Sequence, residues 1–182
     1  MTIHRDQVWE LCRLVALQKH QDPYVLLAIC EQESEKAGRN SLLYRGDVVR
    51  LEQNYYRRYT EPLSWATTTE ALLAMSFGIP QMMGLSLYEL GWFDEEFHRQ
   101  SPEYQVCYIQ PMGEENVPKA LNRYCVSFTD QVQTEADHFA KKLKAAKGDL
   151  REALLFWNGG SNPHYPDEVL RRIPPLKLIY KL

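Results

Sequence analysis

The sequence predicts a mainly α fold. Apolar residues recur at helical spacing in several stretches, among them residues 8–15 and 132–143. Helix-capping patterns stand before residue 24, at residues 67–70 and at residues 149–152. A chain of 182 residues is also long enough to bury one ordinary core. We therefore expect a single domain over residues 1–182, with a small irregular or β insertion around residues 94–130.

The first third of the chain predicts two helices. Residues 7–18 repeat their apolar positions at helical spacing. In the second helix Asp22 is a good N-cap, Pro23 suits the first helical position and Gly38 is a plausible stop. We expect these two helices to pack on each other.

The middle of the chain gives weaker signals. The pattern at residues 67–70 predicts a helix through about Met75, after which residues 76–79 indicate a turn. Pro80 then suits the start of a helix that ends at Gly91. Further along, residues 104–109 suggest a short strand and residues 117–128 a helix.

The last third of the chain is clearer. We expect an amphipathic helix from about residue 132 to Gly148, and a short apolar helix that starts after Asp149. The paired Gly159 and Gly160 permit a sharp turn that aims their neighbours into a cavity. A short helix to about Arg172 and a proline-broken tail follow.

One glutamate of the second helix stands out. At about 100° per residue, Glu33 falls on the apolar arc of that helix, over Leu26 and Ile29. Glu31 and Glu35 fall outside this arc and are expected on the solvated face. A carboxyl held among apolar neighbours is biased toward its neutral form, as a general acid requires. The alternative is a structural glutamate neutralised by an arginine or by backbone N–H groups.

Aromatic and basic residues gather in residues 50–59. Tyrosine rings stack on sugar rings, and neighbouring polar side chains bind hydroxyls, so this stretch suits a glycan cleft. Tyr55, Tyr56 and Tyr59 cannot all face one way, and Tyr56 is the residue we favour for the cleft. The alternative is a packed loop with solvated arginines.

Composition narrows the classes of partner. The net charge of −3 gives no basic field for nucleic acid. Several charged residues interrupt the first twenty positions, and no run reaches transmembrane length. We therefore expect no membrane association, and synthesis in the cytoplasm without a signal peptide. The cysteines lack metal-like spacing, and we expect buried thiols, no metal and no cofactor; they are Cys12, Cys30, Cys107 and Cys125.

Three motifs follow one another along the chain: Glu33-Ser34, then Gly78-Ile79-Pro80-Gln81, then Trp157-Asn158-Gly159-Gly160. In this order they resemble the motifs of the soluble lytic transglycosylases and goose-type lysozymes. The segment YYRRY at residues 55–59 and NPHY at residues 162–165 resemble especially the phage and prophage branch. The resemblance spans roughly residues 24–172 and implies a lysozyme-like domain.

The resemblance implies cleavage of the bond between N-acetylmuramic acid and N-acetylglucosamine in peptidoglycan. Glu33 would protonate the glycosidic oxygen and then, as a base, activate the muramoyl 6-hydroxyl to close a 1,6-anhydro ring. Gln81 and Asn158 would bind the sugar, Ser34 would orient substrate or Glu33, and Trp157 would form an aromatic wall. Pro80 and Trp157 depart from the family pattern.

Two other functions remain open. A hydrolytic muramidase needs a second carboxylate to position water, for which Glu52 is a better candidate than Asp47. A catalytically inactive module would instead bind glycan or build a virion or secretion apparatus. The expected partner is the glycan strand of the cell wall, reached after delivery by another route, and for a structural component it is the virion or secretion apparatus.

Overall fold

The computed structural model describes residues 2–34, 42–51, 71–92 and 117–182. Helices dominate these residues, which confirms the mainly α prediction. They are α1 (Arg5–Lys19), α2 (Pro23–Glu33), α5 (Gly84–Glu89), α6 (Val117–Val126), α7 (Phe128–Ala145), α8 (Leu150–Trp157), α9 (Tyr165–Leu170) and α10 (Ile173–Ile179).

Two small antiparallel sheets accompany the helices. One pairs β1 (Thr2–His4) with β2 (Leu43–Arg45), and the other has the order β3 (Val49–Leu51), β4 (Met75–Phe77), β5 (Met82–Met83). The small β component is therefore present, and its described strands lie in residues 2–4, 43–51 and 75–83. Within the insertion predicted around residues 94–130, α6 and the start of α7 are helical, and residues 93–116 lie outside the described residues.

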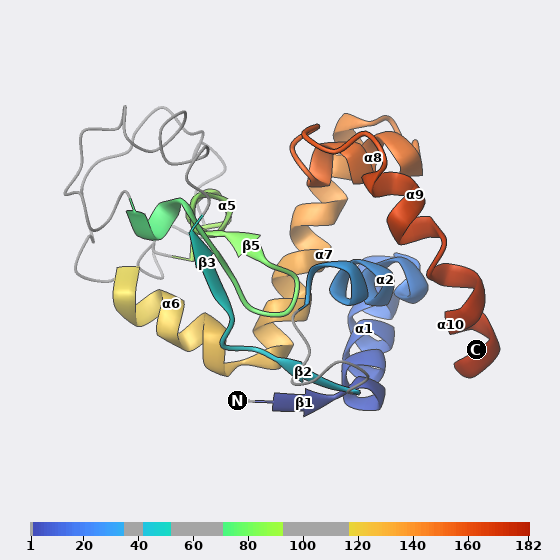
Figure 1. Cartoon of the computed structure of the whole chain (residues 1–182), viewed down its shortest axis with the longest axis horizontal. Helices are drawn as coiled ribbons and strands as arrows, with labels where there is room; N and C mark the ends of the chain where they lie inside the picture. Colours follow the sequence, from blue (N-terminus) through green and yellow to red (C-terminus); the bar gives the residue numbers. More distant parts are fainter. Residues whose placement is uncertain (1, 35–41, 52–70, 93–116) are drawn as a thin grey trace.

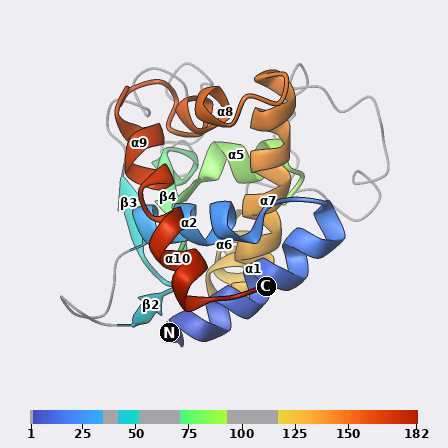
Figure 2. The same cartoon turned by 90° about the vertical axis from the view of Figure 1, so that its right-hand side faces the viewer.

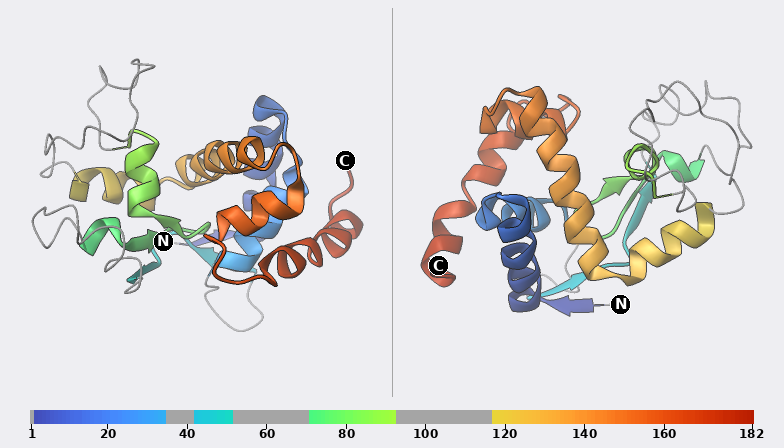
Figure 3. Two further views of the ribbon diagram at one scale, coloured as in Figure 1. Left: turned by 90° about the horizontal axis from the view of Figure 1, so that it is seen from above. Right: turned by 180° about the vertical axis from the view of Figure 1, so that it is seen from behind.

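The elements fall into two parts (Figure 1). The first contains α1, α2 and α8–α10, and the second contains β3–β5 with α5 and α6. Helix α7 runs between them, as the view from behind in Figure 3 also shows. No helix in the described ranges is long and apolar enough to span a membrane.

Helix α2 is the centre of the first part. Its residues 24–31 are all buried, and it contacts α1, α7, α9 and α10. Figure 2 shows it crossing the middle of this part. The predicted start is confirmed, because the Asp22 carboxylate accepts a hydrogen bond from the Tyr24 N–H at 2.8 Å and Pro23 occupies the first turn. The helix ends at Glu33, before the predicted stop.

Gln131 on α7 anchors the second part to α7. Its fully buried amide accepts a hydrogen bond from the Ile79 N–H at 2.8 Å. It also donates to the carbonyl oxygens of Gly46 and Tyr124, each at 3.1 Å. Because both the oxygen and the nitrogen of this buried amide form hydrogen bonds, the amide holds its partner segments in place. The turn between β4 and β5 is therefore held against α7.

The structure corrects the prediction for residues 75–91. Residues 71–73 are helical as predicted, but Met75, the expected end of that helix, already belongs to β4, which pairs with both β3 and β5. Pro80 lies in a turn, and α5 starts only at Gly84. Pairing with a distant strand overrides local helix signals here. The predicted capping residues 67–70 lie outside the described part of the chain.

The last third agrees more closely with the sequence. Helices α7 and α8 form as predicted, and the Asp149 side chain caps α8 by accepting from the Glu152 N–H at 2.9 Å. The prediction for the tail is wrong, because the tail contains α10. Pro174 and Pro175 lie in the first turn of α10. Backbone N–H groups in that turn have no acceptor within the helix, so their absence in proline costs no helical hydrogen bond.

Candidate functional site

Glu33 is the last residue of α2 and is half-buried. The Tyr165 hydroxyl, at the start of α9, donates a hydrogen bond to Glu33 Oε1 at 2.5 Å. Burial, together with the charge of Glu33, raises the pKa of Tyr165, so the phenol keeps its proton and remains a donor. The carboxyl of Glu33 therefore has one oxygen oriented by a rigid, buried side chain.

A second carboxyl, Glu135 on α7, lies next to this site. It is fully buried and accepts from the thiol of Cys30, which is three residues before Glu33, at 3.0 Å. Burial first, and then Cys30 and Glu33, raise the pKa of Glu135 well above its usual range. Its Oε1 is buried without a hydrogen-bond partner in the described structure. Glu135 is thus held as a neutral acid.

Sequence analysis missed Glu135, although a signal was present. Glu135 falls in phase with Val132, Ala136 and Phe139 on the apolar face of α7, and all three of these side chains are buried. The same argument that selected Glu33 on α2 therefore applies to Glu135.

The chain turns sharply after α8, as the paired glycines predicted. Gly159 and Gly160 have φ of 68° and 74°, a conformation that favours glycine. The Asn158 side-chain oxygen accepts from the Asn162 N–H at 2.8 Å and from the Ser161 hydroxyl at 3.0 Å. This turn, residues 158–164, leads directly to Tyr165 and is called the Asn158 turn below.

Trp157 is half-buried at the end of α8. Its ring packs edge-on against His138 at 5.3 Å and against Phe139 at 6.2 Å between centroids. This packing is structural, and the predicted role of Trp157 as an aromatic wall stays a prediction.

Ser34 and Gln81 occupy different surroundings. Ser34 is the C-cap of α2, and its hydroxyl is buried with no hydrogen-bond partner in the described ranges. Gln81 lies in the turn before β5 at φ 49°. Its amide donates to the Gly78 carbonyl at 2.6 Å and accepts from the Ser76 hydroxyl at 2.9 Å. The Gln81 side chain is therefore folded onto its own turn.

The structure brings only some of the predicted residues together. Glu33 and Asn158 are joined through Tyr165 and the Asn158 turn, whereas no hydrogen bond within the described residues links Gln81 to Glu33. The predicted common cleft for these three residues stays a prediction. Tyr56 and the second-carboxylate candidate Glu52 lie outside the described residues, as do Tyr55, Tyr59 and Glu35.

Glu31 does not lie on a solvated face, which corrects the prediction. Its carboxylate pairs with Arg5 at 2.8 Å and with Arg172 at 3.8 Å, and it accepts a hydrogen bond from the Tyr44 hydroxyl. Only 7 % of the Glu31 side chain is exposed. The expectation failed because neighbouring elements cover α2 on more than one side. Helical phase alone therefore does not distinguish Glu33 from Glu31.

Comparisons of the chain with protein-family models, with curated proteins and with solved structures give no match. The resemblance to lytic transglycosylases therefore rests on the sequence motifs. The prediction of buried thiols is confirmed for Cys12 and Cys30; Cys125 is a half-buried free thiol, and Cys107 lies outside the described residues.

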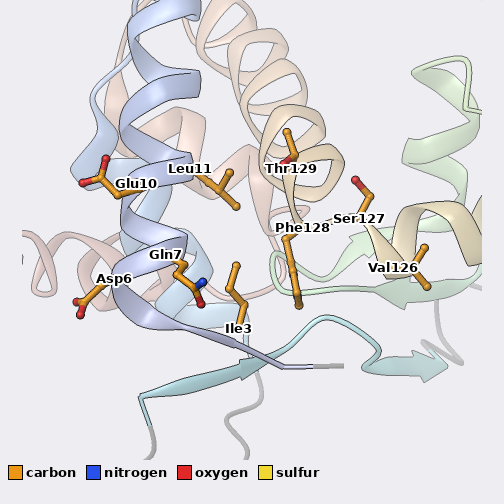
Figure 4. A pocket seen from close by; sticks show the side chains of 9 residues that line it. All are labelled: Ile3, Asp6, Gln7, Glu10, Leu11, Val126, Ser127, Phe128 and Thr129. Atoms are coloured by element: carbon orange, nitrogen blue, oxygen red, sulfur yellow. The ribbon is translucent and has the colours of Figure 1, made fainter.

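Two cavities lie away from Glu33. The first, of about 630 Å³, lies between α1 and the junction of α6 with α7, and Figure 4 shows Asp6 and Glu10 pointing away from it. The second, of about 480 Å³, is lined by Trp92, Arg123 and polar side chains of α7. Neither contains a predicted site residue.

Proposed function

We propose that this chain is a peptidoglycan-cleaving lytic transglycosylase, with Glu33 as its single general acid and base. The observation that carries the proposal is the position of Glu33. Its half-buried carboxyl ends a helix whose residues 24–31 are buried, and it is oriented by a buried tyrosine hydroxyl at 2.5 Å. Enclosure and fixed orientation are what proton transfer to a glycosidic oxygen requires.

The chemistry needs one carboxyl used twice. Protonated Glu33 gives its proton to the oxygen between N-acetylmuramic acid and N-acetylglucosamine as the glycosidic bond breaks. The resulting carboxylate then takes the proton of the muramoyl 6-hydroxyl, whose oxygen attacks the anomeric carbon and closes the anhydro ring. Tyr165 keeps its own proton throughout and orients the plane of the Glu33 carboxyl.

Two described carboxyls can be weighed for the hydrolytic alternative, while its preferred candidate Glu52 lies outside the described residues. A hydrolytic muramidase needs a second carboxylate beside the sugar. Glu135 is near Glu33 but is fully buried and held neutral. Asp47 is exposed in the turn between β2 and β3 and pairs with Arg45 at 3.4 Å. Neither group suits the positioning of water over a sugar ring.

The first experiment compares the wild type with Glu33→Gln on purified peptidoglycan, by zymography and by loss of turbidity. Glutamine keeps the shape of the protonated side chain but has no proton to release, so we expect activity to fall by about 10²–10⁴-fold with the fold intact. Glu152→Gln, at an exposed position of α8, is the matched control and should retain activity. Glu31→Gln is unsuitable because Glu31 is a buried ion-pair partner.

Full activity in Glu33→Gln would contradict the proposal. A wild type that binds peptidoglycan without cleaving it would instead favour the alternative of a glycan-binding or structural component of a virion or secretion apparatus.

A further inference from the structure

Glu168 on α9 joins two segments that the proposed function uses. Its Oε2 accepts a hydrogen bond from the Gln32 side-chain amide at 2.8 Å. Its Oε1 accepts from the Asn162 side-chain amide at 3.3 Å. Gln32 directly precedes Glu33 on α2, and Asn162 belongs to the Asn158 turn. One half-buried carboxylate therefore contacts both segments.

The orientations of both amides are determined by their other partners. Arg172 donates to Gln32 Oε1 at 3.0 Å and 2.7 Å, and a guanidinium can only donate, so the Gln32 NH₂ group must face Glu168. On the other side, Asn162 Oδ1 accepts from the His164 N–H at 2.9 Å, so the Asn162 NH₂ group also faces Glu168. Two donors converge on Glu168, and an ionised carboxylate offers an acceptor to each.

The same contacts continue to both candidate site residues. The Asn162 backbone N–H donates to the Asn158 side chain at 2.8 Å. Tyr165, three residues before Glu168 on the chain, donates to Glu33 at 2.5 Å. Glu168 and Tyr165 thus hold the Asn158 turn and the start of α9 against the last turn of α2 at two separate points.

We propose that Glu168 is a positioning residue, whose carboxylate sets where the Asn158 turn stands relative to Glu33. The inference rests on the proposed function in so far as Asn158 binds the glycan. Glu168 acts through Asn162 and Gln32 and touches no reacting atom, so its loss should weaken substrate binding more than the chemical step.

Exchanging the acid and the amide between positions 168 and 162 tests this directly. In Glu168→Gln the new amide nitrogen meets either the Gln32 or the Asn162 NH₂ group, so one hydrogen bond is lost. In Asn162→Asp two carboxylates face each other. In the double variant, which carries both substitutions, the amide at position 168 accepts from Gln32 and donates to the carboxylate at position 162. Both contacts are then restored, and the net charge equals that of the wild type.

Two measurements report on these variants. Amide hydrogen exchange of residues 158–164 should become about tenfold faster in each single variant, and near wild type in the double variant. KM for soluble peptidoglycan strands should rise about tenfold in each single variant, with a smaller change in kcat, and should recover in the double variant. Glu152→Gln, at an exposed position of α8, should change neither quantity.

The outcomes distinguish a failure of this inference from a failure of the proposed function. If the wild type does not cleave peptidoglycan, the proposed function fails, and the exchange measurement alone decides whether Glu168 holds the turn. Unchanged exchange in Glu168→Gln overturns the inference. The inference is also overturned if exchange in the double variant is as fast as in the single variants, or if neither the single variants nor the double variant folds.

Discussion

Glu33 and Glu31 lie two residues apart on α2, yet different chemistry surrounds them. Glu31 pairs with the cations Arg5 and Arg172, so it is held as a structural anion. Glu33 accepts a hydrogen bond from the neutral hydroxyl of Tyr165. The Tyr165 hydroxyl orients the Glu33 carboxyl and, unlike an arginine, adds no positive charge of its own that would oppose protonation.

The Tyr165 hydroxyl should therefore matter more for catalysis than for packing. Tyr165→Phe keeps the buried ring and removes only the donor to Glu33. We expect activity on peptidoglycan to fall about tenfold or more, and the free energy of unfolding to fall by about 1–2 kcal/mol. Urea unfolding and turbidity assays on the same preparation measure both. Unchanged activity with reduced stability would assign Tyr165 to the fold alone.

At the scale of elements, α7 contains two buried ionisable side chains that folding keeps neutral. Burial raises the pKa of Glu135 from its ordinary value of 4.5. Burial, with Lys142 and Lys141 nearby, lowers the pKa of His138 from 6.5 to about 3. At any pH where the unfolded chain would carry the group in its charged form, keeping that group neutral in the folded state lowers the free energy of unfolding.

These two groups have opposite effects on stability as pH changes. Folded Glu135 holds a proton that the unfolded chain releases above about pH 4.5. The free energy of unfolding therefore falls as pH rises above that value. Unfolded His138 binds a proton below about pH 6.5, whereas folded His138 binds it only near pH 3. The free energy of unfolding therefore falls as pH drops below 6.5. Between pH 4.5 and 6.5 the two trends oppose each other.

Glu135→Gln should expose the trend that His138 causes. Relative to wild type, the free energy of unfolding should rise with pH between 4.5 and 6.5, by about 1 kcal/mol per pH unit. His138→Phe should show the opposite slope relative to wild type. Urea unfolding at several pH values measures these slopes, with the exposed Glu152→Gln as control. Equal slopes in all four proteins would show that neither buried group is held neutral.

The sequence predicted elements best where local signals decided them. Asp22 and Asp149 cap α2 and α8 as predicted, because a cap depends on residues close in the chain. The prediction for Met75 failed, since its strand is decided by pairing with distant β3. The prediction for Glu31 failed for a related reason, because helical phase does not reveal that other elements cover a second face of α2.

The candidate site was predictable only in part. The turn at Gly159 and Gly160 followed from glycine geometry, whereas helical phase placed Glu33 on the buried side but wrongly placed the more buried Glu31 in solvent. Glu135 lay on an apolar face that the same reasoning could have found. The contact of Tyr165 with Glu33 joins residues far apart in the chain, and no local pattern indicates such a contact.

In the whole molecule, Trp157 links two hydrophobic clusters. One is built around α1, α2 and α7, and the other around β4, α5 and α6, and Trp157 packs against both. The Asn158 turn begins at the next residue. The packing of the two parts and the placement of the candidate site therefore depend on the same side chain.

Trp157→Ala should weaken the link between the two parts. We expect a loss of about 3 kcal/mol in the free energy of unfolding, since a large aromatic contact is removed. Hydrogen-exchange protection should fall more in β4 and α6 than in α1 and α2, because the smaller cluster depends more on this contact. Trp157→Phe, which keeps an aromatic ring, should lose less. An equal fall in protection across all elements would show that the clusters do not separate at Trp157.

The products released from peptidoglycan test the central claim most directly. Purified cell-wall sacculi are digested with the wild type, and the soluble fragments are analysed by mass spectrometry. Because the 6-hydroxyl replaces water as the attacking group, we expect fragments that end in 1,6-anhydro-N-acetylmuramic acid, each lighter by one water than the hydrolytic product. Glu33→Gln should release none. Fragments with ordinary reducing ends would contradict the transglycosylase account and establish a hydrolase, and release of anhydro fragments by Glu33→Gln would remove Glu33 from the mechanism.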